Sequence, residues 1–383
     1  MKYCLGFVIC AILMTSCSGV RLTQSGLDAS RFDTIVEGQQ VKLYVLKNHS
    51  GMEVCITNYG GRVVSLMVPD RDGKLTDVVL GFDNIAQYAD TLNSPSDYGA
   101  SVGRYANRIG KAHITIDGMD YALKANDHGN CLHGGFNSGW QNKVYRAEQI
   151  GDSVLRLTIV AEDGENGFPG RVEAVTTYTL TADNTLDVMW TATTDKPTVI
   201  TQTQHNYYNL SGDFTQAAYD QMLYVNADEF VVTDKESIPT GELRSVAGTP
   251  FDFRTPRAVG DSIHSNYEQA RNVGGIDHCF CLNTQGDDTQ VCASLYSPRT
   301  GIYMEVYTNE PGIQIYSANF QGVGRDATIV RKHGLTYPQH VSICMETHRY
   351  PDAPHHPEWE SAMLRPGEQY YSHAAYRFSV IER

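Results

Sequence analysis

Apolar and polar residues alternate with a period of two over many short segments of the chain. Leu155, Leu157 and Ile159 alternate with polar neighbours, and the same spacing recurs over residues 186–192 and 302–306. This is the spacing of a β-strand that buries one face and leaves the other in water. We therefore predict antiparallel strands along most of the chain.

Short glycine-rich turns separate these segments, and helical periodicity is rare. The turns lie at residues 58–61, 70–73, 163–167 and 310–312. Only the stretch from Asp83 to Leu92 favours a helical turn, and neither a low-complexity linker nor a repeat follows residue 35. Many strands with few helices and no break predict an all-β protein with a single large antiparallel sandwich.

The N-terminus has the pattern of an export signal. Lys2 precedes an apolar run, Cys4–Met14, that is too short for a permanent membrane helix. The run ends in Leu-Met-Thr-Ser-Cys, which resembles a bacterial lipobox with Cys17 as the lipidated residue; an ordinary cleaved signal peptide is the alternative. We expect an exported protein, lipid-anchored to a bacterial membrane and facing the periplasm. The predicted organisation is a lipoprotein-type signal peptide, a polar tether and one domain: residues 1–17, 18–35 and 36–383.

Composition narrows the possible partners. The 383 residues include 30 Lys and Arg against 44 Asp and Glu, a net charge of −14, so repulsion from phosphates disfavours nucleic acid as a partner. Six of the nine cysteines follow Cys17, and none has metal-binding spacing. We expect mostly buried thiols.

Two titratable residues stand inside apolar or aromatic strand-like runs. Glu346 lies in Ser-Ile-Cys-Met-Glu-Thr-His, and His205 lies in Thr-Gln-His-Asn-Tyr-Tyr-Asn. Burying a charge costs several kcal/mol unless the group has a partner or a chemical task. A carboxylate and an imidazole that face one pocket can move protons to and from a neutral, hydroxyl-rich substrate.

Further polar groups within apolar or glycine-flanked segments are candidate ligand contacts. Each of them alone could be a satisfied core or turn residue, but several in one β-rich chain favour a shared site. An arginine can fork across neighbouring oxygens, and an aromatic face can pack on a sugar ring. The candidate binding residues are Asn107, Arg108, His133, Tyr207, Asp277 and Gln314.

Other features have simpler readings. Three prolines interrupt the segment that holds His348, His355 and His356, which predicts an extended surface loop rather than a metal site. The acidic turn 163–166 could hold a calcium ion, although it lacks an EF-hand pattern and reads as a solvated hairpin. Trp140 could stack on a sugar, whereas the alternation around Trp190 indicates core packing.

Taken in order, these segments resemble the aldose 1-epimerase (galactose mutarotase) family over roughly residues 40 to 380. The motifs that carry the resemblance are Gly103–Ile109, Leu132–Gly135, Gly164–Gly170, His205–Leu210, Ile238–Gly241, Ile276–His278, Pro311–Gln314, Met345–Thr347 and Arg365–Glu368. The sequence departs from the family's pattern at Gln204, Asn206 and Tyr208, around the histidine, which places fine sugar preference in question.

The resemblance implies a β-supersandwich, His205 as general acid and Glu346 as general base. It implies that the six candidate binding residues hold an aldohexose such as galactose or glucose, and that no metal or organic cofactor is required. We expect a nearby carboxylate to hold the pKa of His205 near or above its ordinary value of about 6.5. We also expect a monomer.

Three other functions compete with this one. A glycoside hydrolase would need two carboxylates astride a glycosidic bond, a role open to Asp277 and Glu346. A sugar-binding lipoprotein would need no catalytic pair, and a phosphosugar epimerase would need a basic phosphate clamp that we do not identify.

Overall fold

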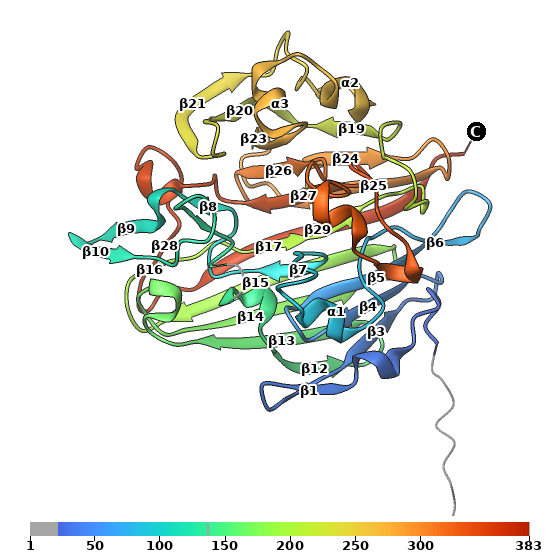
Figure 1. Cartoon of the computed structure of the whole chain (residues 1–383), viewed down its shortest axis with the longest axis horizontal. Helices are drawn as coiled ribbons and strands as arrows, with labels where there is room; N and C mark the ends of the chain where they lie inside the picture. Colours follow the sequence, from blue (N-terminus) through green and yellow to red (C-terminus); the bar gives the residue numbers. More distant parts are fainter. Residues whose placement is uncertain (1–21, 136–137, 383) are drawn as a thin grey trace, which may run out of the picture.

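Antiparallel sheets make up most of the structure, a computed structural model that describes residues 22–135 and 138–382 (Figure 1). The predicted signal peptide and Cys17 lie outside the described residues. Among the helices that are described, none has the length and apolar character needed to cross a membrane.

The largest sheet has nine strands and runs the length of the molecule. In spatial order its strands are β12 (Arg146–Ile150), β13 (Val154–Ala161), β14 (Val172–Leu180), β15 (Thr185–Thr194), β29 (Tyr370–Val380), β25 (Ile302–Thr308), β24 (Ala293–Tyr296), β19 (Met222–Val225) and β22 (Arg257–Ala258).

Two further sheets pack with it. The six-stranded sheet has the order β18 (Tyr207–Tyr208), β27 (Ile343–His348), β26 (Gly312–Tyr316), β23 (Asp277–Leu282), β20 (Ala227–Thr233) and β21 (Pro239–Ser245). The four-stranded sheet has the order β3 (Leu43–Lys47), β4 (Glu53–Thr57), β5 (Arg62–Pro69) and β6 (Leu75–Asp77).

Short strand pairs and helices complete the described part of the fold. The pairs are β1 (Thr34–Val36) with β2 (Gln39–Val41), β9 (His113–Ile116) with β10 (Met119–Ala122), β8 (Arg108–Ile109) with β11 (Cys131–Leu132), β16 (Thr198–Val199) with β28 (Met363–Leu364), and β7 (Ala100–Val102) with β17 (Thr203–His205). The α-helices are α1 (Ile85–Ala89), α2 (Val259–Ile263) and α3 (Glu268–Val273).

The alternating segments form the predicted half-buried strands. In β13 the side chains of Leu155, Leu157 and Ile159 enter the main hydrophobic core, while the residues between them face outward. Trp190 lies in the same core, as its alternation indicates, and donates its indole N–H to the Ser101 hydroxyl. The prediction of a large antiparallel β-sandwich is confirmed, as is the short helix α1 between Asp83 and Leu92.

The six-stranded sheet is covered on both faces at its inner strands. Every residue of β23 and of β27 is buried. Along β27, Ile343 and Met345 enter the main core, so the alternate residues Cys344 and Glu346 point to the opposite face. The face of β27 opposite the main core therefore carries a buried polar residue, and a site can form there.

The N-terminal segment departs from the predicted tether. Within the described part of that segment, Leu27 and Phe32 are 2% and 0% exposed and pack in a hydrophobic cluster with Tyr88 and Tyr98. The Gln24 backbone N–H also donates to the Glu53 carboxylate. Residues 22–35 therefore belong to the folded domain, because two large apolar side chains in a polar-looking stretch gain more from burial than from extension.

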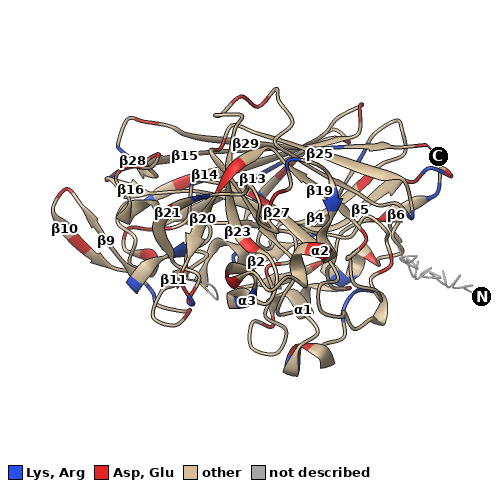
Figure 2. Ribbon diagram, turned by 90° about the horizontal axis from the view of Figure 1, so that it is seen from above, with Lys and Arg blue, Asp and Glu red and all other residues tan. Residues whose placement is uncertain are grey.

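Charged side chains are distributed over the molecule, with Lys and Arg interspersed among Asp and Glu (Figure 2). The six cysteines after Cys17 are all free and buried, as expected.

Candidate active site

A cavity of about 190 Å³ brings together all eight of the site residues predicted from the sequence. Its lining also contains Asp97, Leu132, Tyr316 and Phe320. The predicted residues in the lining are Asn107, Arg108, His133, His205, Tyr207, Asp277, Gln314 and Glu346.

Strand register places three of these side chains next to one another. Gln314 of β26 pairs with Glu346 of β27, and Asp277 of β23 lies two residues from Cys279, which pairs with Gln314. Because side chains two apart on a strand share a face, the three polar groups point to one side of the sheet. The Gln314 amide donates to an Asp277 carboxylate oxygen at 2.7 Å.

The side chains of His205 and Glu346 lie next to each other in the cavity. The His205 Nε2 atom lies 3.5 Å from Glu346 Oε1, and the two residues are 4% and 2% exposed. The Tyr207 ring stacks on the His205 ring with centroids 4.9 Å apart and planes at 17°. This stacking fixes the imidazole plane beside the carboxyl group.

Burial controls the protonation of the pair. It raises the pKa of Glu346 well above its ordinary value, and the charges of Asp277 and Asp97 raise that pKa further while Arg108 opposes them. Desolvation lowers the pKa of His205 to about 3. The expectation that a carboxylate would hold the pKa of His205 near 6.5 is therefore wrong, since the desolvation cost of an imidazolium outweighs that attraction. Both shifts favour the uncharged forms, a protonated Glu346 and a neutral His205, over the ion pair.

Asn107 and His133 come from two turns that contact each other. Both residues have left-handed backbone conformations, with φ of 61° and 50°. The Asn107 backbone N–H donates to His133 Nδ1 at 3.1 Å, so in the neutral ring the proton resides on Nε2. Asn166 holds the His133 turn from behind by donating to the Gly134 carbonyl.

Arg108 supplies the positive charge of the cavity. Its Nε–H donates to Asp127 at 2.8 Å, which orients the guanidinium. Burial raises the pKa of Asp277, and the neighbouring Arg108 charge and the Gln314 hydrogen bond act against that rise.

Several buried polar atoms of the cavity residues have no hydrogen-bond partner within the described part of the chain. They are Asp97 Oδ1, His205 Nδ1, Gln314 Oε1 and Glu346 Oε2. Buried polar groups in native proteins are almost always paired, and an unpaired group costs about 1–3 kcal/mol. A cluster of such atoms around one cavity is what a polar ligand would satisfy.

Sequence reasoning missed Asp97, Tyr316 and Phe320. Tyr316 ends the strand that carries Gln314, and Phe320, 62% exposed, stacks near it with ring centroids 6.4 Å apart. Both follow a recognised motif, so that neighbourhood could have identified them. Asp97 lies in a Ser- and Asp-containing stretch that reads as an ordinary loop, and no local signal marks it.

Other sequence predictions need correction. Trp140 is 1% exposed and packs so closely that a side chain at Gly103 would collide with its ring, so it does not stack on a ligand. His348 lies buried in β27 instead of in a surface loop. Gln204 and Asn206 bond to each other and do not line the cavity, so the departures around His205 do not contact a ligand there.

Two groups of side chains could offer ligand atoms to a metal ion. Asp97, His133 and His205 form one cluster, and His205, Cys344 and Glu346 form another. The Nδ1 lone pair of His133 is used by Asn107, and burial raises the pKa of the Cys344 thiol well above its ordinary value. A metal ligand needs a free lone pair, so the cluster that contains His133 suits a metal ion poorly. In the turn considered for calcium, Lys196 and Lys143 neutralise Asp163 and Glu165.

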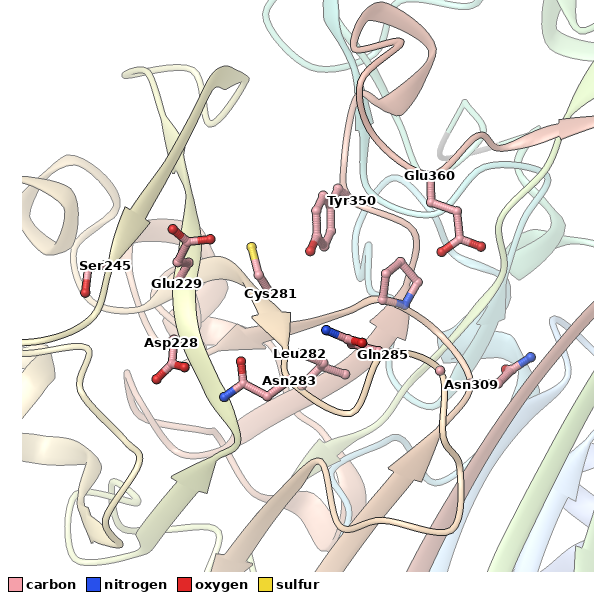
Figure 3. Close-up of a pocket in the computed structure, with 12 residues that line it drawn as sticks. Asp228, Glu229, Ser245, Cys281, Leu282, Asn283, Gln285, Asn309, Tyr350 and Glu360 are labelled. Atoms are coloured by element: carbon pink, nitrogen blue, oxygen red, sulfur yellow. The ribbon is translucent and has the colours of Figure 1, made fainter.

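A larger cavity of about 750 Å³ lies elsewhere, between β20, β23 and the segment around Tyr350 (Figure 3). Its carboxylates are exposed, and Asp228 and Glu360 pair with Arg254 and Arg349 at 2.9 and 3.0 Å. These ion pairs leave it without a convergent acid–base arrangement.

The fold and the smaller cavity define an antiparallel β-sandwich protein in which a buried imidazole and a buried carboxyl group lie side by side in a polar cavity. The family model described as aldose 1-epimerase matches residues 42–377. The chain is 37% identical to rat galactose mutarotase, over 90% of this chain and 95% of the relative. It is 35% identical to the aldose 1-epimerase of Escherichia coli, over 89% of this chain and 96% of the relative.

Solved structures agree with these relatives. An aldose epimerase homologue from C. elegans superposes with a TM-score of 0.81 at 27% identity, covering 89% of this chain and all of that one. The galactose 1-epimerase of Lactobacillus acidophilus gives 0.78 at 27%, covering 91% and 97%. The chain belongs to the aldose 1-epimerase family, which confirms the family resemblance predicted from its sequence motifs.

Proposed function

We propose that the protein interconverts the α and β anomers of aldohexoses such as galactose and glucose by acid–base-catalysed ring opening. The observation that carries this proposal is the 3.5 Å separation of His205 Nε2 and Glu346 Oε1 within one buried polar cavity. The anomeric oxygen O1 and the ring oxygen O5 of a pyranose are bonded to the same carbon. An acid and a base that serve both oxygens must therefore lie side by side.

Each step of the reaction can be written with these two groups. Glu346 removes the proton of the O1 hydroxyl while His205 protonates O5; the C1–O5 bond breaks and C1=O1 forms. Rotation about C1–C2 turns the aldehyde over. O5 then attacks the other face of C1 as His205 takes back the O5 proton and Glu346 returns its proton to O1. Each proton-transfer group contributes about 10²–10⁴-fold.

The shared proton of the resting pair supports this cycle. The reaction starts from a protonated His205 and an ionised Glu346, whereas burial raises the pKa of Glu346 and lowers that of His205, which favours a proton on Glu346 in the empty cavity. Both arrangements contain one proton. A transfer across the pair, favoured when sugar hydroxyls solvate the carboxylate, reaches the active arrangement without exchange with bulk water.

The remaining predicted residues would hold the sugar. Arg108 and Asp277 offer a donor and an acceptor for ring hydroxyls, and Gln314 Oε1 is an unpaired acceptor in the same cavity. Asn107 and His133 supply polar groups from the facing turns, and Tyr207 supplies an aromatic face. We infer that no cofactor takes part, because proton transfers to and from O1 and O5 are the only catalysis that ring opening and closure require.

The experiment replaces each member of the pair while keeping its shape. Glu346→Gln and His205→Asn should each lower enzymatic mutarotation of α-glucose or galactose, followed by polarimetry, by about 10²–10⁴-fold. Thermal melts of both variants verify folding. A near wild-type rate in folded Glu346→Gln would remove the assignment, and glycoside cleavage by the wild type would favour a hydrolase instead.

We propose further that Cys17 carries a lipid that anchors the exported protein at a bacterial membrane, on the periplasmic side. The support is the lipobox-like Leu-Met-Thr-Ser-Cys sequence at the end of the apolar run. Leu22 begins the described, folded part of the chain, so a tether would be limited to residues 18–21. We infer a monomer, because one chain supplies the complete set of eight predicted site residues.

A further inference from the structure

Asp97 is a buried carboxylate whose backbone is held from both sides. It precedes β7, and its neighbours Ser96 and Tyr98 both accept hydrogen bonds at 3.1 Å through their carbonyls from the Arg62 guanidinium. Arg62 itself is fully buried in β5. A fixed arginine that clamps the residues on either side leaves the Asp97 side chain little freedom, which is how preorganised binding groups are built.

The Asp97 side chain points into the cavity without a partner. The residue is 9% exposed and lines the cavity, and its Oδ1 atom is fully covered with no hydrogen-bond donor within the described residues. Burial raises the pKa of Asp97 to about 6, with the Arg62 charge opposing the rise. The group is therefore mostly ionised above neutral pH, where it is an acceptor that needs a donor.

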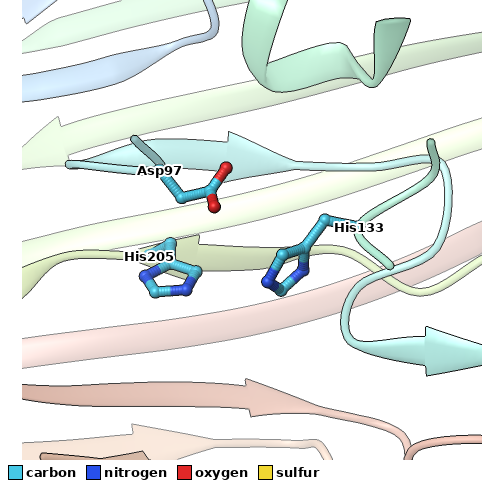
Figure 4. A group of neighbouring side chains, drawn as sticks. All are labelled: Asp97, His133 and His205. Atoms are coloured by element: carbon cyan, nitrogen blue, oxygen red, sulfur yellow. The ribbon is translucent and has the colours of Figure 1, made fainter. Parts of the chain in front are cut away.

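Two histidines complete a three-sided polar space with Asp97. A carboxylate oxygen of Asp97 and one nitrogen each of His133 and His205 all lie within 4.8 Å of one another, and the three side chains converge in Figure 4. His133 presents an N–H in this space, because Asn107 occupies its Nδ1 lone pair. An acceptor facing a donor suits a hydroxyl group, which both donates and accepts, better than it suits a metal.

The position of this polar space beside His205 indicates which sugar hydroxyl would enter it. His205 belongs to two clusters, one with Asp97 and His133 and the other with Cys344 and Glu346, so Asp97 and Glu346 are both neighbours of the same imidazole. If His205 serves O5, the flanking ring carbons are C1, whose hydroxyl Glu346 takes, and C5, which carries the hydroxymethyl group. We infer that Asp97 accepts a hydrogen bond from the hydroxymethyl hydroxyl of an aldohexose, with His133 donating to the same oxygen.

This inference rests on the proposed function and makes Asp97 a residue that selects hexoses over sugars without that hydroxyl. The critical comparison is glucose against 6-deoxyglucose, which differ only at this group. Anomer exchange measured by NMR at equilibrium gives KM and kcat for both sugars without requiring a pure anomer.

Asp97→Ala should raise KM for glucose by about 10- to 100-fold, the effect of losing a hydrogen bond to a charged group. The change for 6-deoxyglucose should stay within about threefold, because that sugar has no hydroxyl to lose. Asp97→Asn keeps the shape without the charge, so its KM for glucose should lie between those of the wild type and Asp97→Ala. It replaces the alanine variant if that variant fails to fold. Asp277→Ala removes another carboxylate of the cavity and should affect both sugars alike.

Equal losses for both sugars would overturn the inference, and so would an unchanged KM for glucose. A wild-type protein without mutarotation would defeat the proposed function separately. In that case the same contrast is sought in the dissociation constants of the two sugars, measured by ligand-observed NMR on wild type and Asp97→Ala. The assignment of Asp97 would then be overturned if the wild type did not bind glucose, or if Asp97→Ala weakened the binding of glucose and 6-deoxyglucose equally.

Discussion

Replacement of Glu346 by glutamine should raise the free energy of unfolding relative to wild type, and this difference should increase with pH. Burial raises the pKa of Glu346 in the folded state, whereas the unfolded chain releases this proton near pH 4.3. Between those two pKa values the folded state holds a proton that the unfolded state has lost. The stabilisation from this proton is fully present below about pH 4.3 and is lost as pH rises through the folded pKa.

The magnitude follows from linkage. The free energy of unfolding of the wild type should fall, relative to Glu346→Gln, by about 1.4 kcal/mol for each pH unit in that window. For a folded domain of this size, an unfolding entropy of about 2.1 cal/mol/K per residue converts each pH unit of the window to a melting-temperature difference of about 1.5–2 °C.

The assay is a set of thermal melts of both proteins at half-unit pH steps. Glu229→Gln, a change at an exposed position of β20, corrects for general effects of removing one negative charge. Titration of His205 is common to wild type and variant, so it largely cancels in the difference. A gap that stays constant from pH 5 to pH 7 would mean that Glu346 is ionised in the folded protein, and it would refute the shared-proton argument.

Two further predictions concern the fold and the N-terminus. Arg349→Ala should cost about 3–5 kcal/mol in urea unfolding because Glu310, fully buried and 2.7 Å from the Arg349 guanidinium, would lose its partner, and a loss below about 1 kcal/mol would contradict this. Cys17→Ser should move the protein out of the membrane fraction or leave an uncleaved precursor without altering its rate of mutarotation. Mass spectrometry that finds an unmodified N-terminus downstream of Cys17 in the membrane-bound wild type would rule the anchor out.

Local sequence was sufficient to predict the strands and to select His205 and Glu346 as the candidate acid–base pair. The alternation around Leu157 and Trp190 has a period that only a strand with one buried face satisfies. His205 and Glu346 were recognisable because a titratable group inside an apolar strand is costly unless it has a role. These signals depend on a few neighbouring residues, so they can be read before the chain is folded.

Other properties depend on contacts between segments distant along the chain. Leu27 and Phe32 look like a tether until the cluster containing Tyr88 covers them. Asp97 becomes a candidate sugar-binding residue only in the folded chain, where Arg62 holds the backbone of its loop and its side chain lies near His133 and His205.

The protonation of the pair was also decided by the tertiary structure. The sequence contains an imidazole and a carboxylic acid, which in water both carry a charge only between their ordinary pKa values of about 4.3 and about 6.5. Burial disfavours both charges, lowering the pKa of His205 and raising that of Glu346, because folding removes the water that stabilises an ion. Residue types and their alternation are properties of the sequence, whereas solvation and the convergence of distant side chains exist only in the folded chain.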